Sequence, residues 1–394
     1  MNSIFSDRIT DVPRSFIREI LKVAVDESII SFAGGLPNRD LFPVQEIKAA
    51  ACKVLDESGK DALQYSSSEG DPELRRWIAQ RYREKQGLAI DPANILITTG
   101  SQQGLDLLGK TIVNEGDGVI MEEPGYLGAI QAFSLYKPLF HSVPLDEDGM
   151  KIDALRRVLS ENAPKLLYCV PNFQNPSGIS YSESNRAAAA AALNGTKTLL
   201  IEDDPYGELR FLGQAKPSFR TFMPDTSVLL GSFSKIVAPS LRIGWIVAND
   251  AVMDKLVIAK QAADLHTNYL GQRIILQYLK DNDLDGHIAK IRKAYGSQRE
   301  AMVDAIRKQF PSETTYTMPE GGMFLWITLP EGLSALSVFE KAIQQKVAFV
   351  PGDPFYVKRK NVNTLRLNFS SVDEETIRMG IKRLGDVLKN MIKR

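Results

Sequence analysis

One stretch of the chain, residues 231–245 (GSFSKIVAPSLRIGW), places a lysine beside two hydroxyls and a guanidinium. The strand-forming run SVLLGSF ends in a small polar loop that carries Lys235, and Arg242 opens a second apolar run. Ser232 and Ser234 supply the hydroxyls, and Arg242 supplies a planar fork that suits a phosphate. Such a set could hold a phosphorylated aldehyde as a Schiff base on the lysine amine. The alternative is a polar loop whose cations face water, which is a common outcome for short motifs.

A helix start follows the strand-like run ILITTG. Ser101 and Gln102 open this helix, and we expect Ser101 to cap it and the free backbone N–H groups to bind a phosphate. Most helix starts bind nothing, so a plain capped helix is the alternative. The residues GSQQG match neither a GxGxxG fingerprint nor a Walker loop, which argues against a dinucleotide or a nucleoside triphosphate as the ligand.

Three further strand-like runs are followed by side chains that could act on a ligand. Tyr126 follows VIMEE, and Asn175 follows LLYCVP. The run TLLIEDD brings Asp203 and, three residues on, Tyr206. Each alone is an ordinary loop or strand-end residue. Because ligands of open α/β sheets bind beyond the carboxyl ends of the strands, all of them would meet Lys235 at one edge. The combined set suits a pyridine aldehyde phosphate.

The composition is that of an ordinary globular enzyme. The chain has 394 residues, 44% of them apolar and 24% charged, which favours two domains or one large domain with an appendage. Lys+Arg and Asp+Glu are both 48, so no nucleic-acid partner is expected. Two cysteines (Cys52, Cys169) and three scattered histidines indicate neither a disulfide framework nor a metal site. The chain shows neither a membrane-length apolar run nor a signal-peptide core, so we expect a cytoplasmic protein with no membrane contact.

The pattern of elements predicts an α/β fold. Helices are expected over 44–63 and 71–86, and then six short apolar strands alternate with helices up to residue 247. This alternation is typical of a mostly parallel sheet covered on both faces. Two long helices are expected over 251–280 and 287–309, followed by a smaller α+β unit with helices at 336–346 and 373–393. We therefore expect an N-terminal helix and substrate-side segment (1–43), a large domain (44–285) and a small C-terminal domain (286–394).

Nine motifs occur in the order found in one enzyme family: FAGGLP, LQYSSSEG, LITTGSQQGLDL, EEPGY, QNPSG, EDDPYGEL, GSFSK with its downstream arginine, GGMFLW and NTLRLNFS. They run nearly end to end, and together they are far more specific than any one of them. The chain resembles the fold-type-I pyridoxal-phosphate aminotransferases of class I/II, within them the 2-aminoadipate aminotransferase and kynurenine aminotransferase II group. The resemblance implies a seven-stranded large domain with pyridoxal 5'-phosphate (PLP) as the cofactor.

The resemblance also implies residue roles. Lys235 would hold the cofactor and then move protons as general base and acid, which requires a neutral amine and hence neighbouring cations that lower its pKa. Asp203 would pair with the pyridine nitrogen; side chains alternate along a strand, so Asp204 should point away. Tyr126 would stack on the ring, and Asn175 and Tyr206 would contact its hydroxyl. The phosphate would be held by Ser101, Gln102, Ser232, Ser234 and Arg242.

Substrate contacts are implied at more distant positions. Arg366 resembles the residue that clamps the substrate α-carboxylate, with Asn175 beside it. Tyr65 resembles the tyrosine that reaches the cofactor phosphate of the other subunit, so a homodimer is expected. Arg18 resembles a helix arginine that contacts a side-chain carboxylate of the substrate, and Gly35 with Leu36 would line the same pocket.

The activity expected from these residues is amino-group transfer from an L-amino acid to a 2-oxo acid such as 2-oxoglutarate, in two half-reactions. The donor stays open among 2-aminoadipate, glutamate, aromatic and branched-chain amino acids and kynurenine. One alternative is a β-lyase or decarboxylase that uses the same cofactor residues. Another is a PLP-sensing regulator, for which residues 1–40 are too short to add a DNA-binding domain. A cofactor-free scaffold would be expected to lack Lys235 or Asp203.

Overall fold

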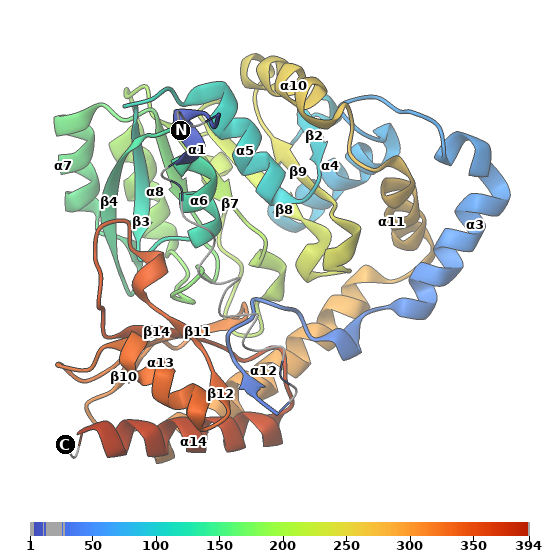
Figure 1. Cartoon of the computed structure of the whole chain (residues 1–394). Helices are drawn as coiled ribbons and strands as arrows, with labels where there is room; N and C mark the ends of the chain where they lie inside the picture. Colours follow the sequence, from blue (N-terminus) through green and yellow to red (C-terminus); the bar gives the residue numbers. More distant parts are fainter. Residues whose placement is uncertain (1–3, 11, 13–25, 27, 393–394) are drawn as a thin grey trace.

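Two β-sheets organise the molecule, and the long helix α12 (Leu284–Gln309) runs from the larger to the smaller (Figure 1). The computed structural model describes residues 4–10, 12, 26 and 28–392. The expected N-terminal helix with Arg18 lies outside these residues. The short helix α1 (Asp7–Thr10) precedes it.

The larger sheet is mostly parallel, as expected, but it has eight strands where the resemblance implied seven, because the short β5 (Gly149–Met150) adds to its edge. In spatial order they are β2 (Ile95–Thr98), β9 (Gly244–Val247), β8 (Ser227–Ser232), β7 (Leu199–Asp203), β6 (Leu166–Cys169), β3 (Gly118–Glu123), β4 (Leu139–Asp146) and β5 (Gly149–Met150). Strand β9 is antiparallel to both neighbours, and β5 is antiparallel to β4. The six predicted strands are confirmed. The pattern of apolar runs missed β4 and β5, which form one edge and of which β4 buries only Val143, so neither carries the continuous apolar signal of a central strand.

Helices cover both faces of this sheet. Alternate residues of β3 show the two faces: Ile120 packs with Leu155 of α7 (Ile152–Asn162) and Ala189 of α8 (Glu183–Leu193), with α9 (Phe219–Phe222) nearby. Val119 and Met121 belong to the opposite core, which includes residues of α5 (Ser101–Ile112) and α6 (Leu127–Ser134). The predicted sheet with both faces buried is therefore confirmed.

The remaining helices of this part agree with the predicted ranges except at one point. Helices α3 (Val44–Ala62) and α4 (Pro72–Gln86) match the predictions. The helix expected over 251–280 is wrong, because the chain breaks it into α10 (Asp250–Asp264) and α11 (Tyr269–Asp281). Leu265 adopts a positive φ of 66°, which ends α10, and the Asn268 side chain accepts the Gly271 N–H, which starts α11.

The smaller sheet lies in the C-terminal part of the chain. Its antiparallel strands are β10 (Thr315–Tyr316), β11 (Phe324–Thr328), β14 (Thr364–Asn368) and β13 (Val350–Pro351), with helices α13 (Ala335–Gln344) and α14 (Glu374–Ile392) beside them. Strand β1 (Ile30–Ser31) pairs with β12 (Val347–Ala348), so the segment before α3 attaches to this part. The expected domain boundary at 285/286 stays a prediction, and it falls in the first turn of α12.

A membrane-spanning segment is not found among the helices of the described residues, since none of them combines sufficient length with sufficient apolarity.

Candidate active site

A cavity of about 360 Å³ opens at the carboxyl ends of the central strands of the larger sheet. It is lined by residues that are far apart in sequence: Gly35, Ser101, Gln102, Tyr126, Val170, Asn175, Asp203, Pro205, Tyr206, Ser232, Ser234, Lys235, Arg242 and Arg366. The structure thus brings together most of the site residues predicted from the sequence. Gly35 and Arg366 come from the segments that attach to or form the smaller sheet, so the cavity lies between the two parts.

Lys235 ends a short 3-10 helix, η4 (Phe233–Lys235), directly after β8. The turn is stable because the Ser232 hydroxyl accepts the Ser234 N–H at 3.0 Å and donates to the Ser234 hydroxyl at 2.8 Å. The Lys235 amine donates to the Gly35 carbonyl at 2.8 Å. Burial, followed by the charges of Arg366 and Arg242, lowers the pKa of Lys235 to about 8. The expected lowering is confirmed, although burial contributes more than the neighbouring cations.

Asp203 is a buried carboxylate at the end of β7, and one of its oxygens lacks a partner. Tyr168 donates its hydroxyl to Oδ2 at 2.7 Å, while Oδ1 accepts no hydrogen bond from the described residues. Burial raises the pKa of Asp203 to about 7, although the Tyr168 bond lowers it. The neighbouring Asp204 accepts from Asn172 and from the Gly207 N–H instead of lining this cavity, as strand alternation predicts. The free oxygen therefore suits a cationic donor on a ligand.

Arg366 is an arginine with almost no exposed surface, on β14. Its Nη1 donates to Asn175 Oδ1 and its Nη2 to the Ala33 carbonyl, each at 2.8 Å, while Nε has no partner among the described residues. The guanidinium lies 4.2 Å from the centroid of the Phe324 ring. Burial lowers the pKa of Arg366 to about 10. A buried guanidinium without a carboxylate partner among the described residues is able to bind an anion.

Three further polar side chains, those of Tyr126, Asn175 and Tyr206, line the cavity with Asp203 and Arg366. Asn175 Nδ2 donates to the Tyr206 hydroxyl at 3.5 Å, and its Oδ1 is the acceptor for Arg366. Burial raises the pKa of Tyr126 to about 12, so its phenol is neutral at physiological pH. These groups can hydrogen-bond and stack on a planar ligand.

The start of α5 also borders the cavity, through Ser101 and Gln102. The prediction that Ser101 caps this helix is wrong, since Gly100 is the N-cap and Ser101 is the first helical residue. Gly100 has a φ of 73°, and a Cβ there would lie 2.4 Å from Arg242 Nη2, so a glycine is needed for this close approach. The first N–H groups of the helix have no acceptor within it and, beside Arg242, they could bind an anion.

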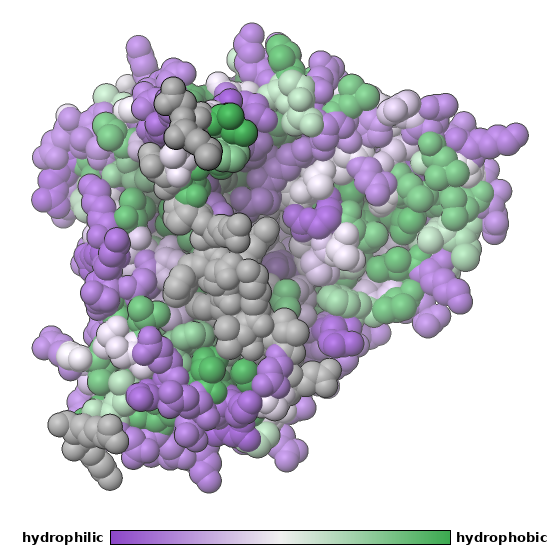
Figure 2. Space-filling view, viewed as in Figure 1, coloured by the Kyte–Doolittle hydropathy of each residue, from purple (hydrophilic) through white to green (hydrophobic). Residues whose placement is uncertain are grey.

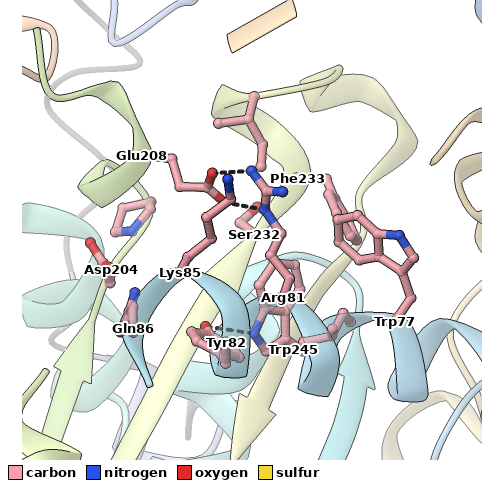
Figure 3. Close-up of a pocket in the computed structure, with 13 residues that line it drawn as sticks. Trp77, Arg81, Tyr82, Lys85, Gln86, Asp204, Glu208, Ser232, Phe233 and Trp245 are labelled. Carbon is pink, nitrogen blue, oxygen red and sulfur yellow. Dashed lines mark hydrogen bonds and ion pairs between the residues drawn. The ribbon is translucent and has the colours of Figure 1, made fainter. Parts of the chain in front are cut away.

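A second, smaller cavity of about 50 Å³ lies behind the Lys235 turn (Figure 3). Trp245 donates to the Tyr82 hydroxyl at 2.9 Å, and its ring packs 4.8 Å from that of Phe233 (Figure 3). This cavity shares Pro205 and Ser232 with the larger one but is too small for a phosphorylated pyridine. Its aromatic residues support the turn from behind.

The other predicted site residues lie elsewhere. The Tyr65 side chain is 79% exposed and does not line the cavity of its own chain. Leu36 was expected in the pocket, but its side chain is exposed because the backbone carbonyl turns inward to accept the Ser370 hydroxyl at 3.0 Å. Arg18 lies outside the described residues.

Sequence reasoning missed a buried acid that supports the site. Glu122 accepts hydrogen bonds from the Val170 N–H at 3.0 Å, the Tyr181 hydroxyl at 2.7 Å and Gln174 at 2.9 Å. These bonds hold the loop that carries Asn175. Burial raises the pKa of Glu122 to about 7. The only signal in the sequence was a polar residue inside a strand-like run.

Comparisons with known proteins identify the family of this chain. The sequence model of the family "Aminotransferase class I and II" matches residues 28–384. The chain is 42% identical to aromatic-amino-acid aminotransferase 1 of Thermococcus litoralis, over 99% of this chain and 95% of the relative. It is also 42% identical to the 2-aminoadipate transaminase of Thermus thermophilus, over 97% and 95% of the two chains. A crystal structure of Pyrococcus horikoshii kynurenine aminotransferase in complex with PMP has a TM-score of 0.95 at 40% identity and covers 99% of this chain and 98% of that one.

The chain therefore belongs to the class I and II aminotransferases, and it has the fold-type-I architecture of that family. It is a PLP-dependent aminotransferase, an enzyme that acts on amino acids and 2-oxo acids. The predicted fold class, enzyme class and cofactor are confirmed.

The residues of the cavity fit this cofactor. Unpartnered Asp203 Oδ1 can accept from a protonated ring nitrogen, and the helix start with Arg242 can bind the phosphate. The cavity volume of about 360 Å³ is within the usual range for small-molecule sites, which is roughly 300–1,000 Å³.

Proposed function

We propose that Lys235, Asp203 and Arg366 are the central residues of this aminotransferase, and that one cavity serves both half-reactions. The observation that carries the proposal is that three groups converge on that cavity: a lysine of lowered pKa, a buried carboxylate with one free oxygen, and a buried guanidinium without a carboxylate partner among the described residues. Bound PLP supplies an aldehyde for the amino group and a protonated ring that withdraws electrons from the substrate α-carbon.

The protein residues would divide the binding of the cofactor among them. Asp203 would keep the ring nitrogen protonated, since a buried anion stabilises a cation beside it. Tyr126 would lie against the ring, and Asn175 and Tyr206 would bind its hydroxyl. The phosphate would be held by Ser101, Gln102, Ser232, Ser234 and Arg242.

Lys235 would carry the proton between substrate and cofactor. Its amine must be neutral to accept a proton, and the lowered pKa of about 8 makes a substantial neutral fraction available near neutral pH. The contact with the Gly35 carbonyl orients the amine inside the cavity.

Arg366 would bind the substrate α-carboxylate. Arg366→Lys is expected to lower kcat/KM by about a hundredfold or more, because disrupting a buried charge pair costs about 2–5 kcal/mol. Lysine keeps the charge but loses the planar fork. Half-reaction kinetics test this, with Arg378→Lys as the control because Arg378 is exposed on α14. The absorbance of the bound cofactor should stay unchanged, and equal kinetics for the Arg366 and Arg378 variants would contradict the assignment.

A homodimer would complete the site. Helix α3 and the loop after it expose Val44, Leu55, Leu63 and Tyr65, and Figure 2 shows apolar surface over the region of α3. Exposed apolar patches of this kind mark interfaces between proteins. Tyr65 would reach the cofactor phosphate of the partner. Sedimentation velocity should give twice the chain mass, and a fully active monomer would contradict the proposal.

The preferred amino donor is proposed to be acidic or aromatic, such as 2-aminoadipate, glutamate or kynurenine. The names of the relatives at 42% identity support this range, since one refers to aromatic amino acids and the other to 2-aminoadipate. Adding one donor at a time to the holo-protein should shift the cofactor absorbance, and 2-oxoglutarate should restore it. The absence of a shift with every one of these donors would overturn the proposal, and a lyase would then be identified by its products.

Arg18 is proposed to select acidic donors. Arg18→Ala should lower the half-reaction rates with 2-aminoadipate and glutamate by about tenfold, which is the effect expected from losing a charge-assisted hydrogen bond. Alanine and leucine should be unaffected, because they carry no second carboxylate. Equal losses for both kinds of donor, measured by half-reaction rates, would argue against the role.

A cytoplasmic location is proposed from composition alone, and cell fractionation would test it.

A further inference from the structure

Lys260 is a fully buried lysine outside the cavity, in the last turns of α10. Its ammonium donates to Gln103 Oε1 at 2.7 Å, to Thr267 Oγ1 at 2.8 Å and to Asp264 Oδ2 at 2.9 Å. All three ammonium protons are thus used. A buried charge is costly unless it is fully paired, so this lysine requires a structural or functional reason.

The Lys260 acceptors converge on the turn that begins α5. Gln103 Oε1 also accepts the Thr99 N–H at 2.8 Å, and Gln103 Nε2 donates to Asp264 at 2.7 Å. The Thr99 hydroxyl donates to the same carboxylate at 3.2 Å. The next two residues of the chain after Thr99 are Gly100 and Ser101, where the anion site begins. Lys260 therefore holds Gln103, which follows the turn, directly, and Thr99, which precedes it, through Gln103 and Asp264.

The same network extends to the loop of Tyr65. Thr267 donates its hydroxyl to the Ile97 carbonyl at 3.2 Å, and its own carbonyl lies 2.9 Å from His266 Nδ1. The other imidazole nitrogen, Nε2, accepts the Ser66 N–H at 3.3 Å. The Tyr65 ring meets the His266 ring edge-on, with the centroids 5.9 Å apart. The segment 264–267 thus lies between the phosphate turn and the Tyr65 loop.

We propose that Lys260 is a positioning residue for phosphate recognition: through Gln103, Asp264 and Thr267 it holds the turn at Gly100–Ser101, and through the 264–267 segment it orders the loop that carries Tyr65. The inference rests on the proposed role of that turn as the phosphate site. In a homodimer, Lys260 would position the phosphate-binding turn of its own subunit. Through the loop that carries Tyr65, it would also position a residue that contacts the cofactor phosphate of the partner subunit.

The prediction is specific to the phosphate. Lys260→Met keeps the length of the side chain and removes the ammonium. The turn therefore loses the hydrogen bonds from Lys260 to Gln103, Asp264 and Thr267, while the ring pocket around Asp203 is unchanged. Affinity for PLP should fall about tenfold or more, the effect of losing hydrogen bonds to a charged group. Affinity for pyridoxal, which lacks the phosphate, should change less than about twofold.

The experiment is an equilibrium titration of the cofactor-free full chain with PLP and with pyridoxal, followed by absorbance. Lys255→Met is the matched control, since Lys255 is exposed on the same helix and the change in charge is identical. Gln103→Met is a second, milder variant, and it should show the same phosphate-specific loss if Lys260→Met does not fold. Equal losses for both ligands, or none for PLP, would overturn the inference. A wild-type chain that does not prefer PLP to pyridoxal would instead refute the proposed phosphate site.

Discussion

Replacement of Lys235 by alanine is expected to lower the rate of transamination by about a thousandfold or more. The change removes both the covalent attachment point and the general acid–base group, and general acid–base catalysis alone contributes a rate factor of about 10²–10⁴. The Lys235 amine is the only amine among the residues that line the described cavity. No neighbouring side chain of the cavity can replace it.

The loss should be confined to chemistry. The Lys235→Ala chain should remain folded and should retain PLP through its phosphate and ring contacts, measured after gel filtration. Lys255→Ala, at an exposed position of α10, provides the control for loss of a lysine. A Lys235→Ala variant with more than about a tenth of the wild-type rate would contradict the assigned role.

The lowered pKa of Lys235 predicts how the rate of PLP uptake depends on pH. A pKa lowered to about 8 means that the amine is mostly charged below that pH and mostly neutral above it. The rate constant for PLP uptake by the cofactor-free chain should therefore rise about tenfold per unit below the pKa and level off above it. A plateau reached only near the ordinary lysine pKa would contradict the lowering.

Asp203→Asn is expected to lower the rate of the first half-reaction by about a hundredfold to a thousandfold, the effect of removing one preorganised electrostatic group from an active site. The amide keeps the shape and can still accept from Tyr168, but it carries no charge to stabilise a protonated ring. Weaker retention of PLP should accompany the loss.

Asp204→Asn is the matched comparison, because the two carboxylates are adjacent in sequence and face opposite ways. Asp204→Asn should lower the stability of the fold, because it disturbs the contacts with Asn172 and Gly207. The rate of the first half-reaction should stay within about threefold of the wild type, since the role of a carboxylate depends on its surroundings and not on its position in the sequence. A larger rate loss for Asp204→Asn than for Asp203→Asn would reverse the assignment.

The central strands and the residues after them could be predicted because their signals are local. Strand β7 carries its own apolar run; the resemblance and the spacing to Tyr206 selected Asp203, and alternation then placed Asp204 on the other face. Strand β4 escaped prediction since an edge strand has mixed burial, and the break at Leu265 escaped because a positive φ at leucine has no sequence signature. The Ser101 cap was wrong because a glycine one position earlier meets Arg242.

The tertiary part of the site could not be predicted from spacing. Arg366 reaches Asn175 across 191 positions of the chain, and only the resemblance to a family joined the two. Tyr168, Glu122 and Lys260 looked like ordinary strand or helix residues, and their hydrogen-bond partners exist only in the folded chain. Local pattern thus identifies the polar residues at the end of a strand, whereas the residues that support them depend on packing.

The central claim is that Lys235 binds the cofactor, and borohydride reduction of the holo-protein followed by peptide mapping tests it most directly. Reduction should fix the cofactor covalently to one peptide, the one that contains Lys235, and a 2-aminoadipate or glutamate addition before reduction should abolish the labelling. A label on another lysine, such as the buried Lys260, or no labelled peptide from a protein that retains PLP, would contradict the account.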